Sequence, residues 1–371
     1  MSAPAERISA LQGAMLIANT ILPTAILFLP ATAAAQAKED AWLSPLVAAA
    51  GGMGLAWIHT ALALRFPGQS LIQLAVQAAG GVLGKLVGFC YLWWWLHITA
   101  VILREFAEFM TIGVAPTTPI SVFILVILAL CAYAVRHGIE VLARANEPIL
   151  AAMTVSLLML VGLVASKMRL DNVMPFLADG LGPVLKGAVA PVSWMGEVVT
   201  ALMAVFPYLA KPKEARPVAM GGLLFTGVIL SVIGFATLAA AGVHATMTAR
   251  VPTLLIARLI EMGDTAERME PLFVAIWVSG NFVKISIFYY SLCQGIAQWL
   301  GLQDYRPLVL PAFTLVAPLS LMIFEDSAQM SSFLDKTWPP YAIVLFELGF
   351  PALLLLLTLM RGTGTKVARN A

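Results

Sequence analysis

Ten long apolar segments constrain the fold of this chain more than any other feature. They cover approximately residues 8–30, 42–64, 84–113, 119–136, 146–166, 187–209, 218–243, 271–300, 307–324 and 339–360. About 20 apolar residues cross the hydrocarbon core of a bilayer. Helices satisfy their own backbone hydrogen bonds there, so lipid-exposed spans of this kind are helical. The sequence therefore predicts an all-α membrane protein with ten transmembrane helices in a single domain, residues 1–371.

The composition agrees with a membrane protein and argues against several other classes. Only 11% of the residues are charged and 60% are hydrophobic, whereas soluble domains carry about 25% charged residues. The formal net charge of +2 includes no basic stripe, so nucleic acid is not an expected partner. The cysteines Cys90, Cys131 and Cys293 have no metal-ligand spacing, and no hydrolase or phosphate-loop motif is present. We expect no enzyme, no metal and no cofactor.

The two halves of the chain share a layout. Five spans fill a first repeat of about 8–166 and five a second of about 187–360, and an odd number of spans gives the repeats opposite orientations. Spans 1 and 6 each contain an interruption, "NTILPTA" and "SWMGE". Paired broken helices in inverted repeats are typical of transporters that bind a ligand near the midplane.

Two connections and both termini complete the predicted topology. Residues 67–81 and 251–264 read as amphipathic helices along the membrane surface. Lysine and arginine are more frequent in the connections that lie inside if the N-terminus is inside. The positive-inside rule therefore favours cytoplasmic N- and C-termini.

Glu197 is the most informative residue of the sixth span. It follows Gly196 about ten residues into an apolar segment, which places it near the midplane. Ionisable groups inside membranes are costly and usually functional. Two readings remain open: Glu197 anchors or protonates a ligand site, or it only pairs with a neighbouring helix.

Three further charged residues lie inside the predicted spans. Lys284 lies far from both ends of span 8 and needs a partner such as Glu197; it either takes the place of a coupling ion or forms a plain ion pair. Glu347 in span 10 is a second, weaker intramembrane carboxylate. Glu105, close to the C-terminal end of span 3, is expected in a solvated cluster.

The order of several short motifs resembles the spore germination permease family. The similarity includes "LQGAMLIANTIL" and "FLP" in span 1, "DAWLSPL" and "RFP" at the ends of span 2, "RHGIEVLARANE" before span 5, "DNVMPFLADGLGPVLKG" and "GEVV" around span 6, and "ERMEPLFVAIW" at span 8. These proteins are B subunits of nutrient germinant receptors and belong to the amino acid–polyamine–organocation superfamily. The resemblance implies a LeuT-type 5+5 inverted repeat with broken helices 1 and 6.

The resemblance also implies a function and a site. The expected protein binds a small nutrient, typically an amino acid, in the inner spore membrane and works with an A-type membrane subunit and a C-type lipoprotein. The matching ligand-binding positions are Leu22, Pro23, Thr24, Ala25, Trp94, Ile98, Trp194, Gly196, Glu197, Lys284 and Phe288. A proton-coupled amino acid transporter is the alternative, and a scaffold subunit that binds no ligand is a third reading. Pro23 and Ala25 stand where the family commonly has glycines, so the sequence leaves the ligand's identity open.

Overall fold

The computed structural model describes residues 6–249, 251–259 and 269–364 of the chain. Within those residues the regular structure is helical, and the β contact is one isolated parallel bridge between Ile8 and Leu209. Five described stretches are long and apolar enough to cross a membrane by themselves, and two shorter apolar helices accompany them. The prediction of an all-α membrane protein is confirmed.

Every predicted span coincides with helical structure. The first half contains α1 (Ala10–Ala37), α2 (Ser44–Arg65), α3 (Leu71–Ala79), α4 (Gly81–Gly113), α5 (Ile120–Arg136) and α6 (Ile139–Val164). The second half contains α7 (Leu181–Leu202), α8 (Ala215–Ala241), α9 (Val243–Thr248), α10 (Pro252–Arg258), α11 (Met269–Leu300), α12 (Val309–Met322), α13 (Ser327–Ser332), α14 (Trp338–Tyr341) and α15 (Gly349–Arg361). The two predicted surface helices correspond to α3 and to α10; residues 260–264 of the second lie outside the described residues.

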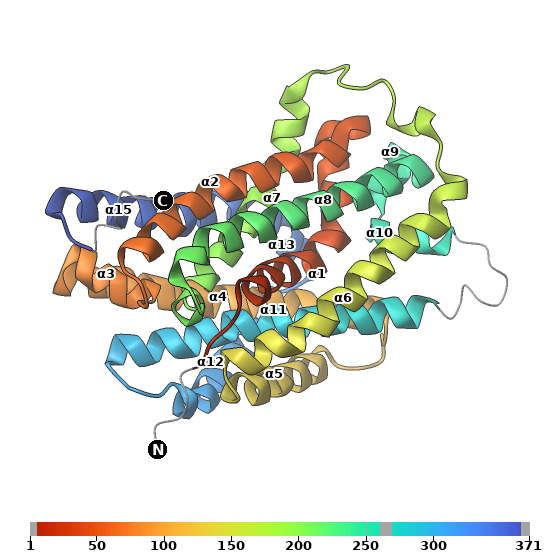
Figure 1. Ribbon diagram of the computed structural model, residues 1–371. Helices are drawn as coiled ribbons and strands as arrows, with labels where there is room; N and C mark the ends of the chain where they lie inside the picture. Colours follow the sequence, from red (N-terminus) through yellow and green to blue (C-terminus); the bar gives the residue numbers. More distant parts are fainter. Residues whose placement is uncertain (1–5, 250, 260–268, 365–371) are drawn as a thin grey trace.

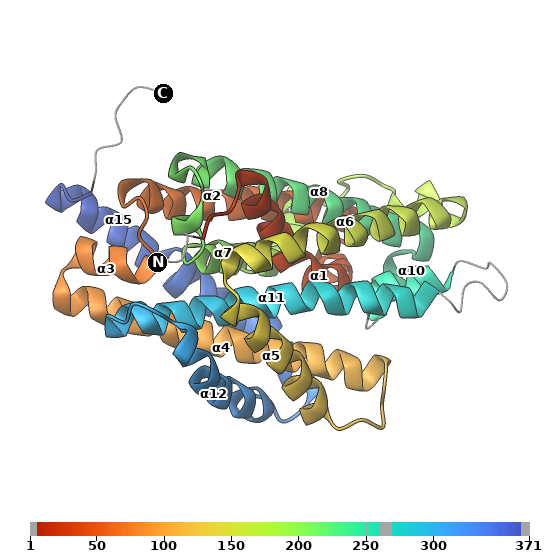
Figure 2. The same ribbon diagram turned by 60° about the horizontal axis from the view of Figure 1, so that its bottom comes forward.

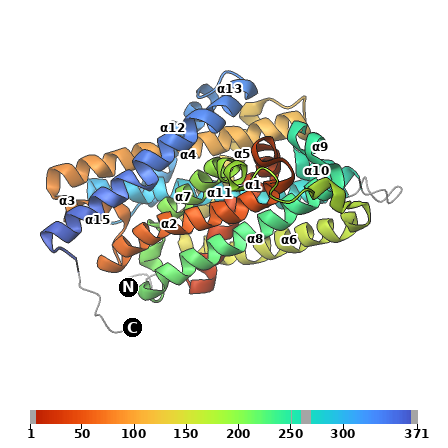
Figure 3. The ribbon, with the colours of Figure 1, turned by 90° about the horizontal axis from the view of Figure 1, so that it is seen from above.

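Helix α1 lies at the centre of the bundle. It packs against α6, α7, α8 and α11 (Figure 1). Helix α11 in turn lies between α1 and α4 (Figure 2). Both ends of the described chain lie at the same end of the bundle as α3, and α9 and α10 lie at the opposite end (Figure 3). Side chains from α1, α4, α7 and α11 can therefore meet inside the bundle.

Local sequence signals set the start of α1 and of α3. Ser9 and Gln12 form a capping box, because the Ser9 hydroxyl accepts from the Gln12 amide at 3.1 Å and the Gln12 side chain accepts from the Ser9 amide at 2.8 Å. Ser70 and Gln73 repeat this arrangement at α3. Gly80 then turns the chain into α4 with a φ of 90°, a value that side chains disfavour.

The tenth span is not one regular α-helix. Two π-helical segments, η8 (Phe333–Thr337) and η9 (Ala342–Glu347), separate α13, α14 and α15. Such turns are rare and occur frequently at functional sites. Here they position Trp338 and Glu347 toward α7, which both residues contact.

The predicted interruptions of spans 1 and 6 need correction. Helix α1 remains helical through Pro23. At this position Trp277 donates its indole N–H to the Pro23 carbonyl at 2.7 Å. Helix α7 is likewise continuous through Gly196 and Glu197 and ends at Leu202, inside the predicted span. The sixth span is therefore interrupted after Leu202 and not at Glu197.

Candidate functional site

Lys284 of α11 connects the polar residues in the middle of the bundle. Its ammonium donates to the Thr24 hydroxyl of α1 at 2.9 Å and lies 3.7 Å from the Glu197 carboxylate of α7. The lysine is 2% exposed and Glu197 is 4% exposed. Both charges are thus removed from solvent, and each depends on the other for compensation.

Glu105 of α4 belongs to the same cluster, which corrects the expectation of a solvated position. The Thr24 hydroxyl donates to Glu105 Oε2 at 3.3 Å, and Glu105 is 7% exposed. Its neighbours in sequence are also largely buried: Arg104 pairs with Glu108 at 2.9 Å and donates to the Leu321 carbonyl at 2.9 Å. Lys284, Thr24 and Glu105 therefore form a chain of hydrogen bonds from an ammonium to a carboxylate.

Trp338 completes the coordination of Glu197. Its indole N–H donates to Glu197 Oε2 at 3.2 Å, while Lys284 faces Oε1 of the same carboxylate. Trp338 is held by an edge-to-face contact with Trp94, with ring centroids 5.4 Å apart. Oε2 of Glu197 thus has a hydrogen-bond donor and Oε1 faces an ammonium, and the two contacts together orient the carboxylate.

A cavity of about 110 Å³ opens beside this cluster. Polar groups line one part of it and apolar side chains the rest; the lining residues are Thr24, Phe28, Thr32, Ile98, Val101, Ile102, Glu105, Trp194, Glu197, Lys284, Met330, Ser331, Leu334, Asp335 and Trp338. A few charged groups on an otherwise apolar wall are typical of a small-molecule site. The size fits a ligand no larger than a small amino acid.

The structure brings together five of the eleven sequence-predicted site residues. Thr24, Ile98, Trp194, Glu197 and Lys284 line the cavity, whereas Leu22, Pro23, Ala25, Trp94, Gly196 and Phe288 do not. Leu22, Ala25 and Phe288 are packed in the hydrophobic core, and Trp94 supports Trp338 from behind. Sequence reasoning missed Glu105 and Trp338.

Gly196 has a packing role. A methyl group at this position would overlap the carboxyl group of Glu347 and lie 2.8 Å from Leu55. Glu347 is fully buried, and neither of its carboxyl oxygens has a hydrogen-bond partner among the described residues. The missing side chain at Gly196 therefore lets a second acidic group approach α7 directly behind Glu197.

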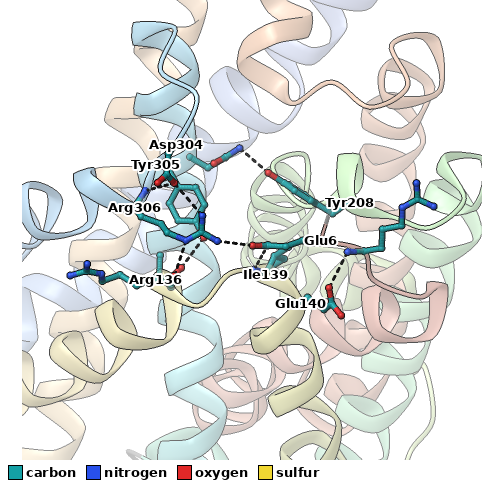
Figure 4. A network of polar contacts seen from close by, with 11 residues as sticks. Glu6, Arg136, Ile139, Glu140, Tyr208, Asp304, Tyr305 and Arg306 are labelled. Atoms are coloured by element: carbon teal, nitrogen blue, oxygen red, sulfur yellow. Dashed lines mark hydrogen bonds and ion pairs between the residues drawn. The ribbon is translucent and has the colours of Figure 1, made fainter. Parts of the chain in front are cut away.

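The end of the bundle that carries the termini is closed by a polar network around Glu6 (Figure 4). Glu6 pairs with Arg306 at 3.1 Å and accepts from the Ile139 amide at 3.0 Å. Arg306 also donates to the Arg136 carbonyl at 3.0 Å. The chain before α1 thus joins the α5–α6 and α11–α12 connections. Phe28 and Thr32 of α1 and Met330 and Ser331 of α13 contribute to the cavity wall.

Comparison with known families decides what kind of protein carries this site. Residues 7–330 match the family described as "Spore germination protein". The chain belongs to this family. The match covers the spans that form the cavity up to α13, and it confirms the resemblance of the sequence motifs.

Individual relatives agree with the family assignment. "Spore germination protein KB" of Bacillus subtilis (strain 168) is 27% identical over 336 residues, which are 89% of each chain. "Spore germination protein YndE" of the same organism is 25% identical over 304 residues, 80% of this chain and 82% of the relative.

Solved structures identify the fold. Mhp1, a nucleobase-cation-symport-1 family transporter in a closed conformation with bromovinylhydantoin bound, has a TM-score of 0.67 at 14% identity and covers 92% of this chain and 78% of its own. MhsT in complex with L-phenylalanine has a TM-score of 0.62 at 12% identity, covering 96% and 99%. The LeuT-type fold is confirmed, and at these identities the likeness concerns the fold alone.

Proposed function

We propose that this protein is the membrane subunit of a spore nutrient germinant receptor that binds a small nutrient in the central cavity. The nutrient is of amino-acid size, and binding signals to A-type and C-type partner subunits in the inner spore membrane. Both termini lie in the cytoplasm in this proposal, and the cavity opens away from it. The protein is a binding and signalling subunit and not an enzyme.

The observation that carries the proposal is the cavity beside Lys284 and Glu197 in a member of the spore germination family. Pairing of two charged groups so far from solvent is expensive, and membrane proteins retain such groups mainly at ligand and ion pathways. Thr24 and Trp338 fix the two charges. A ligand that enters the cavity changes the contacts between helices α1, α7 and α11. If the ligand binds one conformation of these helices more tightly than another, it shifts the protein toward that conformation.

The alternative is a proton-coupled amino acid transporter of the same fold. Such a transporter would bind its ligand in the same cavity and release it through the end of the bundle that the polar network around Glu6 closes. Uptake of a labelled amino-acid panel into proteoliposomes, with and without an inward proton gradient, separates the two. A receptor subunit shows no gradient-driven uptake. Gradient-driven accumulation would make the protein a carrier and overturn the receptor proposal.

Glu197→Gln is expected to weaken ligand binding by at least about tenfold. The amide keeps the size of the side chain but removes the charge that Lys284 and Trp338 hold in place, and hydrogen bonds to charged groups contribute about 1.5–3 kcal/mol. Binding to purified protein in lipid nanodiscs measures the effect. Glu147→Gln, on the exposed surface of α6, is the control and should bind as the wild type does. Unchanged binding by Glu197→Gln would remove this residue from the site.

A further inference from the structure

The charges that line the cavity do not balance. Three carboxylates, those of Glu105, Glu197 and Asp335, face it, against one ammonium, that of Lys284. Asp335 is exposed, whereas the other three groups are each at least nine-tenths buried. The enclosed part of the cavity thus holds two carboxyl groups and one ammonium group.

Lys284 is already shared between the two buried carboxylates. It faces Glu197 directly at 3.7 Å, and it reaches Glu105 through the Thr24 hydroxyl, which accepts from the lysine at 2.9 Å and donates to the carboxylate at 3.3 Å. Thr24 can donate one proton only. In this chain of hydrogen bonds Glu105 Oε2 is therefore the acceptor.

One oxygen of Glu105 is left for a ligand. Its Oε2 accepts from Thr24, and no hydrogen bond reaches Oε1 within the described part of the chain, although the residue is only 7% exposed and lines the cavity. This oxygen is not enclosed by protein atoms, so it can accept a hydrogen bond from a donor that enters the cavity. A ligand ammonium between Glu105 and Glu197 would donate to this oxygen and place a second cation beside the two carboxyl groups.

A ligand carboxylate finds no comparable partner. Helices α1 and α7 are continuous beside the cavity, so their amides are used within the helices, and Pro23 has no N–H to offer. The basic side chain in the cavity lining is Lys284. A ligand carboxylate would have to compete with Glu197 for this lysine and would lie next to the carboxyl groups of Glu105 and Glu197. Such a juxtaposition is repulsive in a site that excludes water.

We propose that the cavity selects its ligand through a cationic amine and that a free carboxylate on the ligand weakens binding. The preferred class is a small amine of net positive charge, with its ammonium between Glu105 and Glu197 and its apolar part against Ile98, Ile102 and Trp194. Glu105 is the residue that sets this preference. The inference rests on the proposed function, since it names the ligand class of the same cavity.

Three probes of equal heavy-atom number test the preference on the full chain in lipid nanodiscs at pH 7. L-alaninamide carries an ammonium and no carboxylate, L-alanine carries both, and L-lactamide carries neither. Titration calorimetry is expected to give L-alaninamide an affinity at least about tenfold higher than L-alanine, with L-lactamide weaker than either. L-alanine binding as tightly as L-alaninamide, or more tightly, would overturn the inference and leave the proposed function intact.

Glu105→Gln provides the second measurement. It should lower the affinity for L-alaninamide about tenfold and bring it close to that of L-alanine, because it removes the surplus negative charge. Glu147→Gln should preserve the wild-type preference. A Glu105→Gln protein that folds and keeps the full preference for L-alaninamide over L-alanine would contradict the role assigned to Glu105. If this variant fails to fold, the comparison of the three probes on the wild-type protein still tests the ligand class. No binding of any probe by folded wild-type protein would overturn the proposed function together with the inference.

Discussion

Lys284→Met is expected to destabilise the protein by about 3–5 kcal/mol, the usual cost of removing one partner from a buried ion pair. Methionine fills much the same volume but leaves the Glu197 and Glu105 carboxylates without their shared cation. Thermal unfolding of the purified protein in detergent micelles measures the loss as a lower melting temperature. A melting temperature equal to that of the wild type would show that the lysine does not compensate these carboxylates.

The double variant Lys284→Met/Glu197→Gln controls for the loss of packing. It removes both members of the direct pair and should be more stable than Lys284→Met alone, because one of the two uncompensated charges disappears. If Glu197→Gln lowers the stability of the Lys284→Met protein by as much as it lowers that of the wild type, the two side chains do not interact. The 3.7 Å contact would then contribute nothing to stability.

Gly84→Ala is expected to destabilise the protein by about 3 kcal/mol, at the upper end for overpacking. Gly84 lies where α4 crosses α3, and a methyl group there would meet the Val76 backbone and lie 2.5 Å from the Ala75 carbonyl oxygen. Backbone atoms of a packed helix cannot move aside as a side chain can. Thermal unfolding in detergent again gives the measurement.

Gly81→Ala is the matched control, three residues earlier on the same helix. Apart from its chain neighbours and the backbone of its own helix, no atom of the described residues lies within 4 Å of a methyl group at Gly81. We expect an unchanged or slightly higher stability, since alanine has the better helix propensity. Equal losses at both positions would mean that the cost comes from the helix itself and not from the contact with α3.

The spans and their order could be predicted because each follows from local hydrophobicity. The ten apolar segments and the intramembrane position of Glu197 and Lys284 need no knowledge of what lies beside them. The structure then adds their distance of 3.7 Å. The division into repeats at about 8–166 and 187–360 stays a prediction.

Glu105 and Trp338 could not be placed in the site from the sequence, for two physical reasons. Helix α4 has 33 residues and is about 50 Å long, well beyond the roughly 30 Å hydrocarbon core, so distance from its end does not give depth. Trp338 precedes the apolar run of span 10 and contacts Glu197 from a short helix, α14, that lies between two π-helical segments. Periodicity analysis has no signal for such turns.

The interruptions were misplaced because their consequences depend on distant residues. Helix α1 is continuous through Pro23, whose carbonyl accepts a hydrogen bond from Trp277, far along the chain. The carbonyl of Ala201 near the end of α7 accepts from Ser291 at 3.1 Å, in addition to the Ala204 amide at 3.0 Å. Neither partner can be identified from the local sequence of spans 1 or 6.

The central claim is that the cavity beside Lys284 and Glu197 holds the ligand, and filling the cavity tests it most directly. Ile98→Trp places an indole in a space of about 110 Å³. Val122→Trp, on the exposed surface of α5, adds the same group outside the cavity. The account predicts that L-alaninamide binding to protein in lipid nanodiscs is lost in folded Ile98→Trp and retained in Val122→Trp. Undiminished binding by folded Ile98→Trp would contradict it.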